Sequence, residues 1–300
     1  MWLPEFACAC GRPLLPDDRQ RMACCICGVR VVLENGLYRA VDPARLAACE
    51  PFLAQYRIVR ERDGYRNARA EYYRALPSPG RDDPQWSVWQ IRQRSFDRLC
   101  RRVIGRRVGL SVLDLGAGSG WLSRRLADRG LRAVAVDLLA DDRDGLGASR
   151  HYEAAFACVQ ADFDAPPFSP RQFDLVVFNG SLHYAPDVHA TLRHAASMLR
   201  GGGRLVVIDS PMFESEADGA AMRQRDRDRL RTRHGLASPI QPGEGFLTFA
   251  RLATAAASTG RPSPRFFATD DGWRRRLMRI GAAVGMTHVK PARFGVWVAA

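Results

Sequence analysis

The chain has 300 residues, of which 46% are hydrophobic and 26% charged, and this composition excludes a disordered chain and suits one large α/β domain with a small appendage. The formal net charge of +13 creates a field that attracts anions, so nucleic acid remains a candidate partner. The first residues, MWLPEFACACG, lack the basic and apolar segments of a secretory signal, and nowhere do about 18 apolar residues run without a charge. We therefore expect a cytosolic protein without a membrane segment.

Residues 1–42 contain two cysteine knuckles and are expected to form a small module of their own. Four thiolates at this spacing can surround one Zn²⁺, and the glycine after each knuckle lets the chain turn beneath the metal. The pattern resembles a zinc ribbon with a structural metal. Disulfides are disfavoured in a reducing cytosol, unliganded cysteines are the other alternative, and Cys25 can take the place of Cys24. The expected ligands are Cys8, Cys10, Cys24 and Cys27.

Residues 43–107 are expected to form helices that connect this module to a larger domain. In the stretch WSVWQIRQRSFDRLCRRVIG, Trp89, Phe96, Leu99 and Val103 recur at helical spacing, with arginines on the other side. This pattern predicts an amphipathic helix whose apolar face packs against a sheet.

From Leu110 onward, short apolar runs alternate with helix-like segments. Such alternation predicts a mostly parallel sheet with helices on both faces. Only the residues KPAR separate the last two runs, too few for a crossover helix, so we expect those two to pair as an antiparallel hairpin at one edge of the sheet. The expected strands are 112–115, 133–136, 156–159, 173–178, 205–208, 286–289 and 294–298.

A glycine-rich turn follows the first of these strands. Gly116, Gly118 and Gly120 lie between that strand and a helix expected over 121–129. Glycines adopt positive φ and let a ligand approach the backbone, and the free N–H groups at the start of a helix favour an anionic part of a ligand. The spacing is G-x-G-x-G, which differs from the G-x-G-x-x-G of dinucleotide binders.

Two acidic residues indicate which ligand this turn holds. Asp137 ends the second strand, where a carboxylate can accept both hydroxyls of a ribose. Asp114 lies two residues before Gly116, and its charge would repel the pyrophosphate of a dinucleotide by several kcal/mol at about 4 Å. A ligand whose far end carries an ammonium and a sulfonium suits this position better.

With these residues in place, the sequence resembles the class I S-adenosylmethionine-dependent methyltransferases over roughly 111–300. Five segments match the family in its order and spacing. The resemblance implies a Rossmann-like, seven-stranded sheet whose last strand is antiparallel, in a domain spanning 108–300. The matching segments are VLDLGAGSG, AVAVD, VQADFDAPPF, FDLVVFNGSLHYAPD and LRGGGRLVVID.

Carried over residue by residue, the resemblance implies a set of contacts with S-adenosylmethionine. Asp137 would hold the ribose, with a surface acid as the alternative. Asp162 would accept from the adenine amino group, with a turn cap as the alternative, and Phe163 would pack near the ring. The segment after the fourth strand would face the donor sulfur. The remaining expected cofactor contacts are Asp114, Gly116, Gly118, Gly120, Asn179, Gly180 and Leu182.

The acceptor side is less defined. His183 and Tyr184 follow the fourth strand, where a base or an orienting hydroxyl reaches the acceptor, although both side chains could simply pack over the cofactor. The segment lacks the NPPY and Pro-Cys signatures of nucleic-acid methylases and is most similar to small-molecule methyltransferases. Residues 210–260 are expected to form a substrate lid, and Tyr72, Tyr73 and Arg74 could close the opposite side.

Two other functions remain open at this stage. An RNA methyltransferase would use the zinc ribbon and the arginine clusters to grip phosphates, and its binding would weaken steeply with salt. The alternative for the clusters is a set of solvated helix faces. A third possibility is a non-catalytic binding or scaffold protein. The sequence identifies neither the acceptor nor the oligomeric state.

Overall fold

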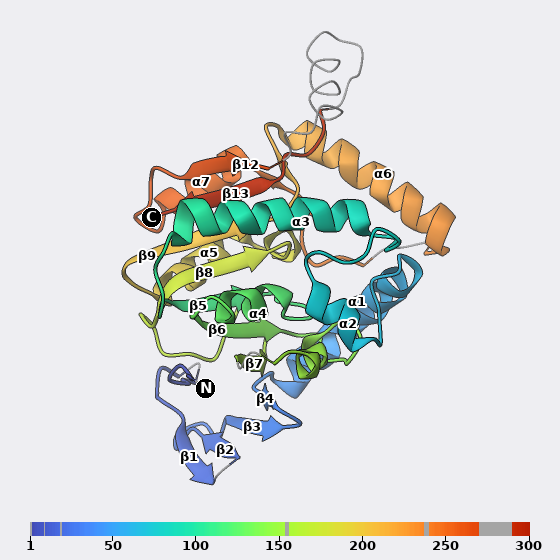
Figure 1. The fold of residues 1–300 in the computed structure, drawn as a ribbon. Coiled ribbons are helices and arrows are strands. Elements are labelled where there is room, and N and C mark those ends of the chain that lie inside the picture. Colours follow the sequence, from blue (N-terminus) through green and yellow to red (C-terminus); the bar gives the residue numbers. More distant parts are fainter. Residues whose placement is uncertain (1, 9, 19, 154–155, 237–239, 270–289) are drawn as a thin grey trace.

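The computed structural model describes residues 2–300 apart from 9, 19, 154–155, 237–239 and 270–289. Eleven strands in the described residues form one sheet with the order β1-β2-β3-β4-β7-β6-β5-β8-β9-β13-β12 (Figure 1). Two further short strands, β10 and β11, pair in parallel. The strands are β1 (Leu15–Asp18), β2 (Arg21–Ala23), β3 (Arg30–Glu34), β4 (Leu37–Arg39), β5 (Ser111–Leu115), β6 (Arg132–Asp137), β7 (Ala157–Gln160), β8 (Phe173–Asn179), β9 (Leu199–Ile208), β10 (Met212–Phe213), β11 (Leu247–Thr248), β12 (Arg265–Ala268) and β13 (Gly295–Ala299).

The centre of the sheet is parallel, as the alternation of apolar runs and helices predicts. β7, β6, β5, β8 and β9 all run in one direction, and every residue of β5 is buried. β5 has β6 on one side and β8 on the other, so the direction in which strands are added reverses at β5. A crevice forms at such a switch point beyond the carboxyl ends of the strands, and ligands bind there in open α/β sheets.

The last strand is antiparallel, but its partners differ from those expected. β13 pairs with β9 on one side and with β12 on the other, both antiparallel. The predicted hairpin between 286–289 and 294–298 is therefore wrong, because β12 occupies the position that 286–289 was expected to take. Residues 286–289 themselves lie outside the described residues.

The N-terminal strands join the large sheet instead of forming a separate body. β4 pairs in parallel with β7, and β1 to β3 continue outward from β4 as antiparallel neighbours. Phe6 packs against Tyr38 and Phe168 at ring distances of 5.4 and 5.2 Å. The sheet in the described residues thus has eleven strands. Seven of them lie within 108–300, and the other four come from the cysteine-containing segment, because hydrogen bonding continues past β7.

Helices cover both faces of the sheet, and alternate strand residues supply the two cores. Leu113 and Leu115 face the α5 and α7 side, where they share a core with Leu192 and Leu252, while Val112 faces the α3 and α4 side (Figure 1). The helices are α1 (Pro43–Arg62), α2 (Ala70–Ala75), α3 (Trp86–Leu99), α4 (Trp121–Ala127), α5 (Val188–Ser197), α6 (Glu216–His234) and α7 (Phe249–Ala257), with shorter turns η1 (Cys100–Ile104), η2 (Leu146–His151) and η3 (Leu182–Tyr184).

The predicted amphipathic helix corresponds to α3, in which Trp89 and Leu99 are buried. The expected lid segment is split between two environments. α7 belongs to the core, since Leu252 is fully buried beneath the sheet, whereas α6 lies beside α1 at the other end of the molecule (Figure 1). In the described part of 210–260, α7 is therefore not free to cover a ligand, whereas α6 lies outside this core.

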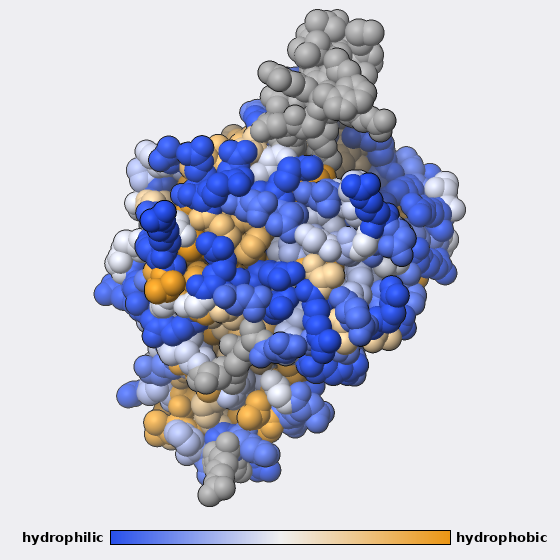
Figure 2. Space-filling view, viewed as in Figure 1, coloured by the Kyte–Doolittle hydropathy of each residue, from blue (hydrophilic) through white to orange (hydrophobic). Residues whose placement is uncertain are grey.

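The surface is mostly hydrophilic on the face shown in Figure 2, and apolar atoms gather over the N-terminal strands. Leu15, Ile26 and Val29 are the exposed large apolar side chains of that region. Within the described part of the chain, no helix is both long enough and apolar enough to cross a membrane.

Candidate active site

The glycine turn after β5 forms a tight loop against the neighbouring strands. Gly116, Gly118 and Gly120 have φ angles of 74°, 56° and 73°, in the left-handed region that residues with a Cβ rarely adopt. A Cβ on Gly116 would lie 2.3 Å from the Cβ of Ser181. The loop can therefore approach the end of β8 only because Gly116 has no side chain.

A cavity lies under this loop, at the carboxyl ends of β5, β6 and β8. Strand-end residues form its floor, and aromatic residues of α1, α2 and α3 form much of its wall. Because the wall is mostly aromatic, a ligand here would be shielded from water. The lining includes Phe52, Leu53, Tyr56, Arg60, Tyr65, Tyr72, Tyr73, Trp89, Arg92, Gly116, Ala117, Gly118, Ser119, Trp121, Asp137, Leu138, Leu139, Asp144, Phe163, Asn179, Gly180, Ser181 and Tyr184.

Asp137 places a half-buried carboxylate in this cavity, at the position predicted from the sequence. Its Oδ2 accepts from the backbone N–H of Gly118 and its Oδ1 from that of Leu139, both at 2.7 Å. Burial raises the pKa of Asp137 to about 6, although the two N–H donors oppose this shift. The carboxylate is thus held rigidly beside the glycine loop.

The cavity wall also contains an ion pair that was not predicted from the sequence. Arg60 of α1 donates to both oxygens of Asp144, through Nε at 2.6 Å and through an Nη at 2.8 Å. The guanidinium carbon lies 3.4 Å from the ring centre of Tyr65, and the side chains of Arg60 and Asp144 are only 15% and 8% exposed. The two residues are 84 positions apart. No short sequence motif contains both of them, so the pair could not be predicted from residue spacing.

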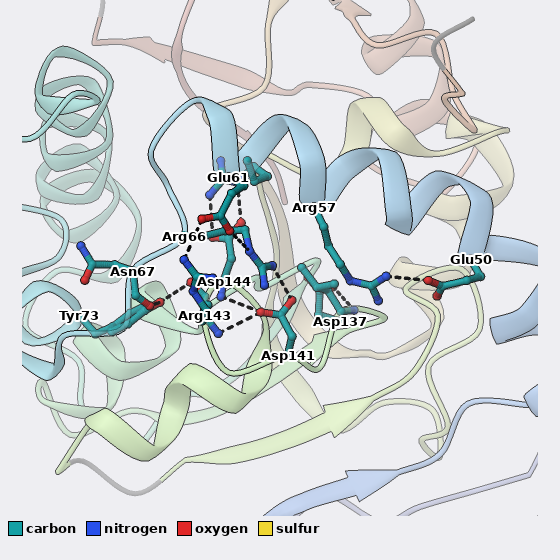
Figure 3. A network of polar contacts seen from close by, with 12 residues as sticks. Glu50, Arg57, Glu61, Arg66, Asn67, Tyr73, Asp137, Asp141, Arg143 and Asp144 are labelled. Atoms are coloured by element: carbon teal, nitrogen blue, oxygen red, sulfur yellow. Dashed lines mark hydrogen bonds and ion pairs between the residues drawn. The ribbon is translucent and has the colours of Figure 1, made fainter. Parts of the chain in front are cut away.

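Further ion pairs fasten the end of α1 to the loop after β6, as Figure 3 shows. Arg66 lies 2.9 Å from Glu61 and 3.1 Å from Asp141, and Arg143 lies 2.8 Å from Glu61. Asp141 also accepts from the backbone N–H of Asp144 at 3.1 Å. The end of α1 is therefore held against the loop after β6 by several charged contacts.

Asp114, a predicted cofactor residue, does not line the cavity. It is completely buried within β5, where its Oδ2 accepts from Ser123 Oγ at 2.9 Å and its Oδ1 has no hydrogen-bond partner in the described residues. Burial raises the pKa of Asp114 to about 7, and the charge of Asp137 adds to this shift. Asp114 therefore lies behind the glycine loop, out of direct reach of the cavity.

The two residues predicted at the adenine end are placed differently from each other. Phe163 lines the cavity. Asp162 does not, because its Oδ2 accepts from Arg45 Nε of α1 at 2.6 Å and its Oδ1 from the backbone N–H of Asp164 at 3.0 Å. The carboxylate of Asp162 is thus used to attach α1 to the sheet.

Of the other predicted cofactor residues, some line the cavity and some do not. Asn179 and Gly180 line the cavity with Gly116 and Gly118. Leu182 is fully buried in the core, and a Cβ on Gly120 would meet the Phe156 ring at 3.1 Å. The structure thus brings the loop glycines 116 and 118, Asp137, Phe163, Asn179 and Gly180 together, but not Asp114, Gly120, Asp162 or Leu182.

A second, larger cavity of about 540 Å³ adjoins the first. Gly180 and Tyr184 line both, so the two spaces meet at the end of β8. Residues of α1 and α3 continue from one cavity into the other. The residues shared by the two cavities are Phe52, Tyr56, Arg60, Tyr65, Arg92, Gly180 and Tyr184.

His183 and Tyr184 both face the second cavity, but their protonation differs from that of a general base. His183 Nδ1 lies 3.2 Å from Ser210 Oγ, and burial lowers the pKa of His183 to about 3. Burial raises the pKa of Tyr184. Both side chains are therefore uncharged near neutral pH. Their rings are 4.3 Å apart, and Tyr184 also packs on Phe52 at 5.6 Å.

Asp209, the residue directly after β9, was not singled out from the sequence. It has a φ of 55°, a conformation that costs a residue with a side chain about 1–3 kcal/mol and that clusters at functional sites. Ser95 donates to its Oδ1 at 2.6 Å, while its Oδ2 is buried with no partner in the described residues. Asp209 lines the second cavity, and its backbone oxygen lies 3.5 Å from where a Cβ on Gly180 would stand.

The predicted cysteine set converges near the N-terminus. The Sγ atoms of Cys8, Cys10, Cys24 and Cys27 lie within 4.8 Å of one another, and Cys25, the alternative ligand, is exposed and not in this group. Cys8 Sγ is 3.1 Å from Cys10 Sγ and 2.9 Å from Cys27 Sγ. Four sulfurs this close together are able to hold one metal ion.

Comparison with known proteins supports the assignment of this fold. A family model described as a methyltransferase domain matches residues 88–241, just over half of the chain, including the glycine loop, Asp137 and the end of β8. The chain belongs to this methyltransferase family. The matched range also contains α6 and most of α3, whereas α1 and α2, which form other parts of the cavity walls, lie before it.

Curated relatives with established names match parts of the chain. It is 37% identical over 116 residues to malonyl-[acyl-carrier protein] O-methyltransferase of Enterobacter lignolyticus, covering 39% of this chain and 45% of that protein. It is 27% identical over 188 residues to sarcosine/dimethylglycine N-methyltransferase of Halorhodospira halochloris, covering 58% of this chain and 67% of that protein. The chain thus spans about half the length of the curated relatives it matches.

A solved structure shares the fold at low sequence identity. The magnesium protoporphyrin IX methyltransferase of Synechocystis PCC 6803, solved with bound SAH, superposes with a TM-score of 0.51 at 16% identity. The match covers 86% of this chain and 99% of that one. The likeness is to a methyltransferase with a Rossmann-like, largely parallel sheet.

Proposed function

We propose that this protein transfers a methyl group from S-adenosylmethionine to a small-molecule acceptor. The observation that carries the proposal is the junction of two cavities at Gly180 and Tyr184, one beneath the glycine loop and one open toward α6. Methyl transfer requires the donor and the acceptor to be held in line with water excluded. Two adjoining cavities with aromatic walls suit that requirement.

The residues of the first cavity fit the proposed donor. Asp137 offers a rigid carboxylate to the two ribose hydroxyls, with Leu138 and Phe163 nearby as apolar surface for the adenine. Gly116 and Gly118 leave the backbone open beside the methionine part. Asp114 lies behind the loop and would act on the cationic end of the donor only through space, and Asp162 would hold α1 in position through Arg45.

When bound, the donor supplies an electrophilic methyl group on a sulfonium. The residues of this chain then have to orient the acceptor and receive any proton that it loses. Tyr184 is placed to orient the acceptor, because it lines both cavities. The lowered pKa of His183 makes this residue a weak base, so we propose that Asp209, with its unpartnered oxygen, is the better proton acceptor.

Calorimetry tests the proposal without knowledge of the acceptor. S-adenosylmethionine and S-adenosylhomocysteine should both bind to the purified protein, whereas NADH should not. Asp137→Ala should weaken both by about 100-fold, as the loss of two hydrogen bonds to a charged group predicts. The matched control is Asp142→Ala, which removes an exposed carboxylate from the same loop and should bind normally. Binding of NADH alone would refute the proposal.

We also propose that Cys8, Cys10, Cys24 and Cys27 hold a structural Zn²⁺. Tetrahedral Zn–S bonds of about 2.3 Å place sulfurs about 3.8 Å apart, and the four Sγ atoms here converge to a comparable spacing. Gly11 and Gly28 follow the knuckles with φ angles of 80° and 70°, as tight turns beneath a metal require. The backbone N–H of Cys10 also donates to Cys8 Sγ at 3.3 Å, which stabilises a thiolate.

A further inference from the structure

The wall of the second cavity that α6 supplies is basic. One stripe of α6 faces this cavity, and its residues are spaced at helical intervals. The stripe consists of Met222, Arg223, Asp226, Arg229, Leu230 and Arg233. The rest of α6 is equally polar, but that part faces away from the cavity. The stripe therefore presents guanidinium groups to whatever occupies the second cavity.

One arginine of this stripe, Arg229, already has a carboxylate partner. Asp226 lies 3.8 Å from Arg229, and Asp63 lies 3.3 Å from His234. Asp209 accepts from Ser95. In the described residues, none of the carboxylates that line the second cavity lies within ion-pair distance of Arg223.

Arg223 and Arg92 both line the second cavity. In the part of the chain that the structure describes, neither has a carboxylate within ion-pair distance. Arg92 lies 4.5 Å from the Trp89 ring centre. Partial burial, with the nearby charge of Arg227, lowers the pKa of Arg223, while the charges of Asp226 and Glu244 act in the opposite direction. A partly desolvated guanidinium without an anion is unfavourable, so an anionic ligand at this point would be stabilised.

The remainder of the second cavity combines apolar side chains with polar ones such as Gln55, Gln85 and Gln241. Phe52, Val59, Val88, Leu236 and Ile240 line it beside Tyr56 and Tyr184. A volume of about 540 Å³ lies within the range of small-ligand sites, about 300–1,000 Å³. The surroundings therefore fit a small molecule with an apolar body and one anionic group.

We propose that the second cavity binds a small organic carboxylate as the methyl acceptor, with its carboxylate held by Arg223 and assisted by Arg92. This inference rests on the proposed methyl-transfer function, since it takes the second cavity to be the acceptor site. Guanidinium groups pair with carboxylates through two parallel hydrogen bonds, and the apolar wall holds the rest of the molecule. The end of the acceptor that receives the methyl group then points toward Gly180.

Three probes that share one ring test the charge preference. They are 4-hydroxyphenylacetate, 4-hydroxyphenylacetamide and tyramine, which are anionic, neutral and cationic. Each is titrated by calorimetry into protein saturated with S-adenosylhomocysteine. We expect the anion to bind at least tenfold more tightly than the amide and tyramine not to bind. Equal affinities for the three probes, or no binding of the anion at 10 mM or below, would overturn the proposal.

Variants of two arginines on α6 test whether Arg223 itself binds the carboxylate of the probe. Arg223→Gln should weaken binding of the anionic probe by about 10- to 100-fold, the loss typical of a charge-assisted pair, and Arg223→Lys should restore part of it. Arg225→Gln, which removes an exposed arginine from the same helix, should leave the affinity unchanged. Equal losses in Arg223→Gln and Arg225→Gln would mean that only the general positive field attracts the probe, and would refute the assignment to Arg223.

The donor titration separates this inference from the proposed function. Arg223→Gln should bind S-adenosylhomocysteine as the unaltered protein does, which also shows that the variant is folded. Failure of the unaltered protein to bind S-adenosylhomocysteine would overturn the proposed function, and with it the acceptor role. The three probes are then titrated into the free protein, where preference for the anion would still establish the carboxylate site.

Discussion

Asp114 combines complete burial with an oxygen that has no hydrogen-bond partner in the described residues. Such a group is destabilising when ionised, because a buried charge loses its hydration. Its position behind the loop suggests a reason for its presence. A cationic donor in the neighbouring cavity would offset its charge, so the free protein would be strained at a point that the donor relieves.

The raised pKa of Asp114, about 7, predicts a dependence of stability on pH. A carboxyl group whose pKa is higher in the folded than in the unfolded protein binds more protons when folded, so stability falls as pH rises from about 4 to 7. Asp114→Asn removes this dependence. In urea unfolding without ligand, we expect the variant to gain stability relative to the unaltered protein at pH 8 but not at pH 4.

His183 opposes this trend in the unaltered protein. Its lowered pKa, about 3, means that the unfolded chain binds the proton first, so stability falls as pH drops below about 6.5. Comparison of Asp114→Asn with the unaltered protein at each pH cancels the His183 contribution, since both proteins contain His183. An equal gain at pH 4 and pH 8 would contradict a raised pKa at Asp114.

Asp137 predicts the pH dependence of donor binding. Its pKa is raised to about 6 in the free protein, and the ionised carboxylate accepts hydrogen bonds from ribose hydroxyls better than the protonated form does. Donor affinity should therefore rise between pH 5 and pH 7 and then level off. Calorimetry with S-adenosylhomocysteine at these pH values measures it, and an affinity that falls over this range would argue against the ribose assignment.

At the scale of elements, α1 depends on its charged contacts with the loop after β6. The Arg60–Asp144 pair is buried and bidentate, whereas Arg57–Glu50 on the same helix is 34% and 52% exposed. Removal of one partner of a buried pair leaves the other charge uncompensated. An exposed pair contributes much less, because water and salt screen it.

We therefore expect Arg60→Leu to lower the free energy of unfolding by about 3–5 kcal/mol. Arg57→Leu, the control on the same helix, should change it by less than about 1 kcal/mol. Urea unfolding at pH 7 gives both values. Similar small losses in the two variants would mean that α1 is held by apolar packing alone.

The cysteine module permits a test of the metal site. Cys27→Ser should release about one zinc per chain and destabilise β1 to β3, which extend the sheet outward from β4. Cys25→Ser, which alters an exposed cysteine outside the cluster, should retain the metal. Elemental analysis of the purified proteins decides between these outcomes. Loss of metal in both variants would show that the ligand set is wrong.

At the scale of the whole molecule, the net charge of +13 attracts RNA whether or not RNA is the substrate. The salt dependence of RNA binding therefore distinguishes a small-molecule methyltransferase from an RNA methyltransferase. A positively charged surface binds RNA weakly without sequence preference, and such binding is lost by orders of magnitude between about 50 and 200 mM salt. We expect this loss for a structured RNA measured by fluorescence anisotropy, while binding of S-adenosylhomocysteine changes little. RNA binding that persists at 200 mM salt would favour an RNA substrate instead.

The local features of the site were predictable because each lies within a short segment. The three glycines, the carboxylate at the end of β6 and the two cysteine knuckles are motifs in which backbone conformation or ligand chemistry restricts the residue type. Asp114 shows the limit of this reasoning. Its spacing from Gly116 predicts proximity to the loop, but the side of the strand that the carboxylate occupies depends on what packs against β5.

The sequence by itself therefore determined the parallel α/β architecture, the loop beneath which a donor would lie and the residues that would hold a metal, since periodicity and short-range geometry carry that information. Only the tertiary structure decided that β1 to β4 extend the sheet, that β12 pairs with β13, and that Arg60, Asp209 and Arg223 face the cavities. These features depend on contacts between residues far apart in the chain, where burial and charge pairing act without any local pattern.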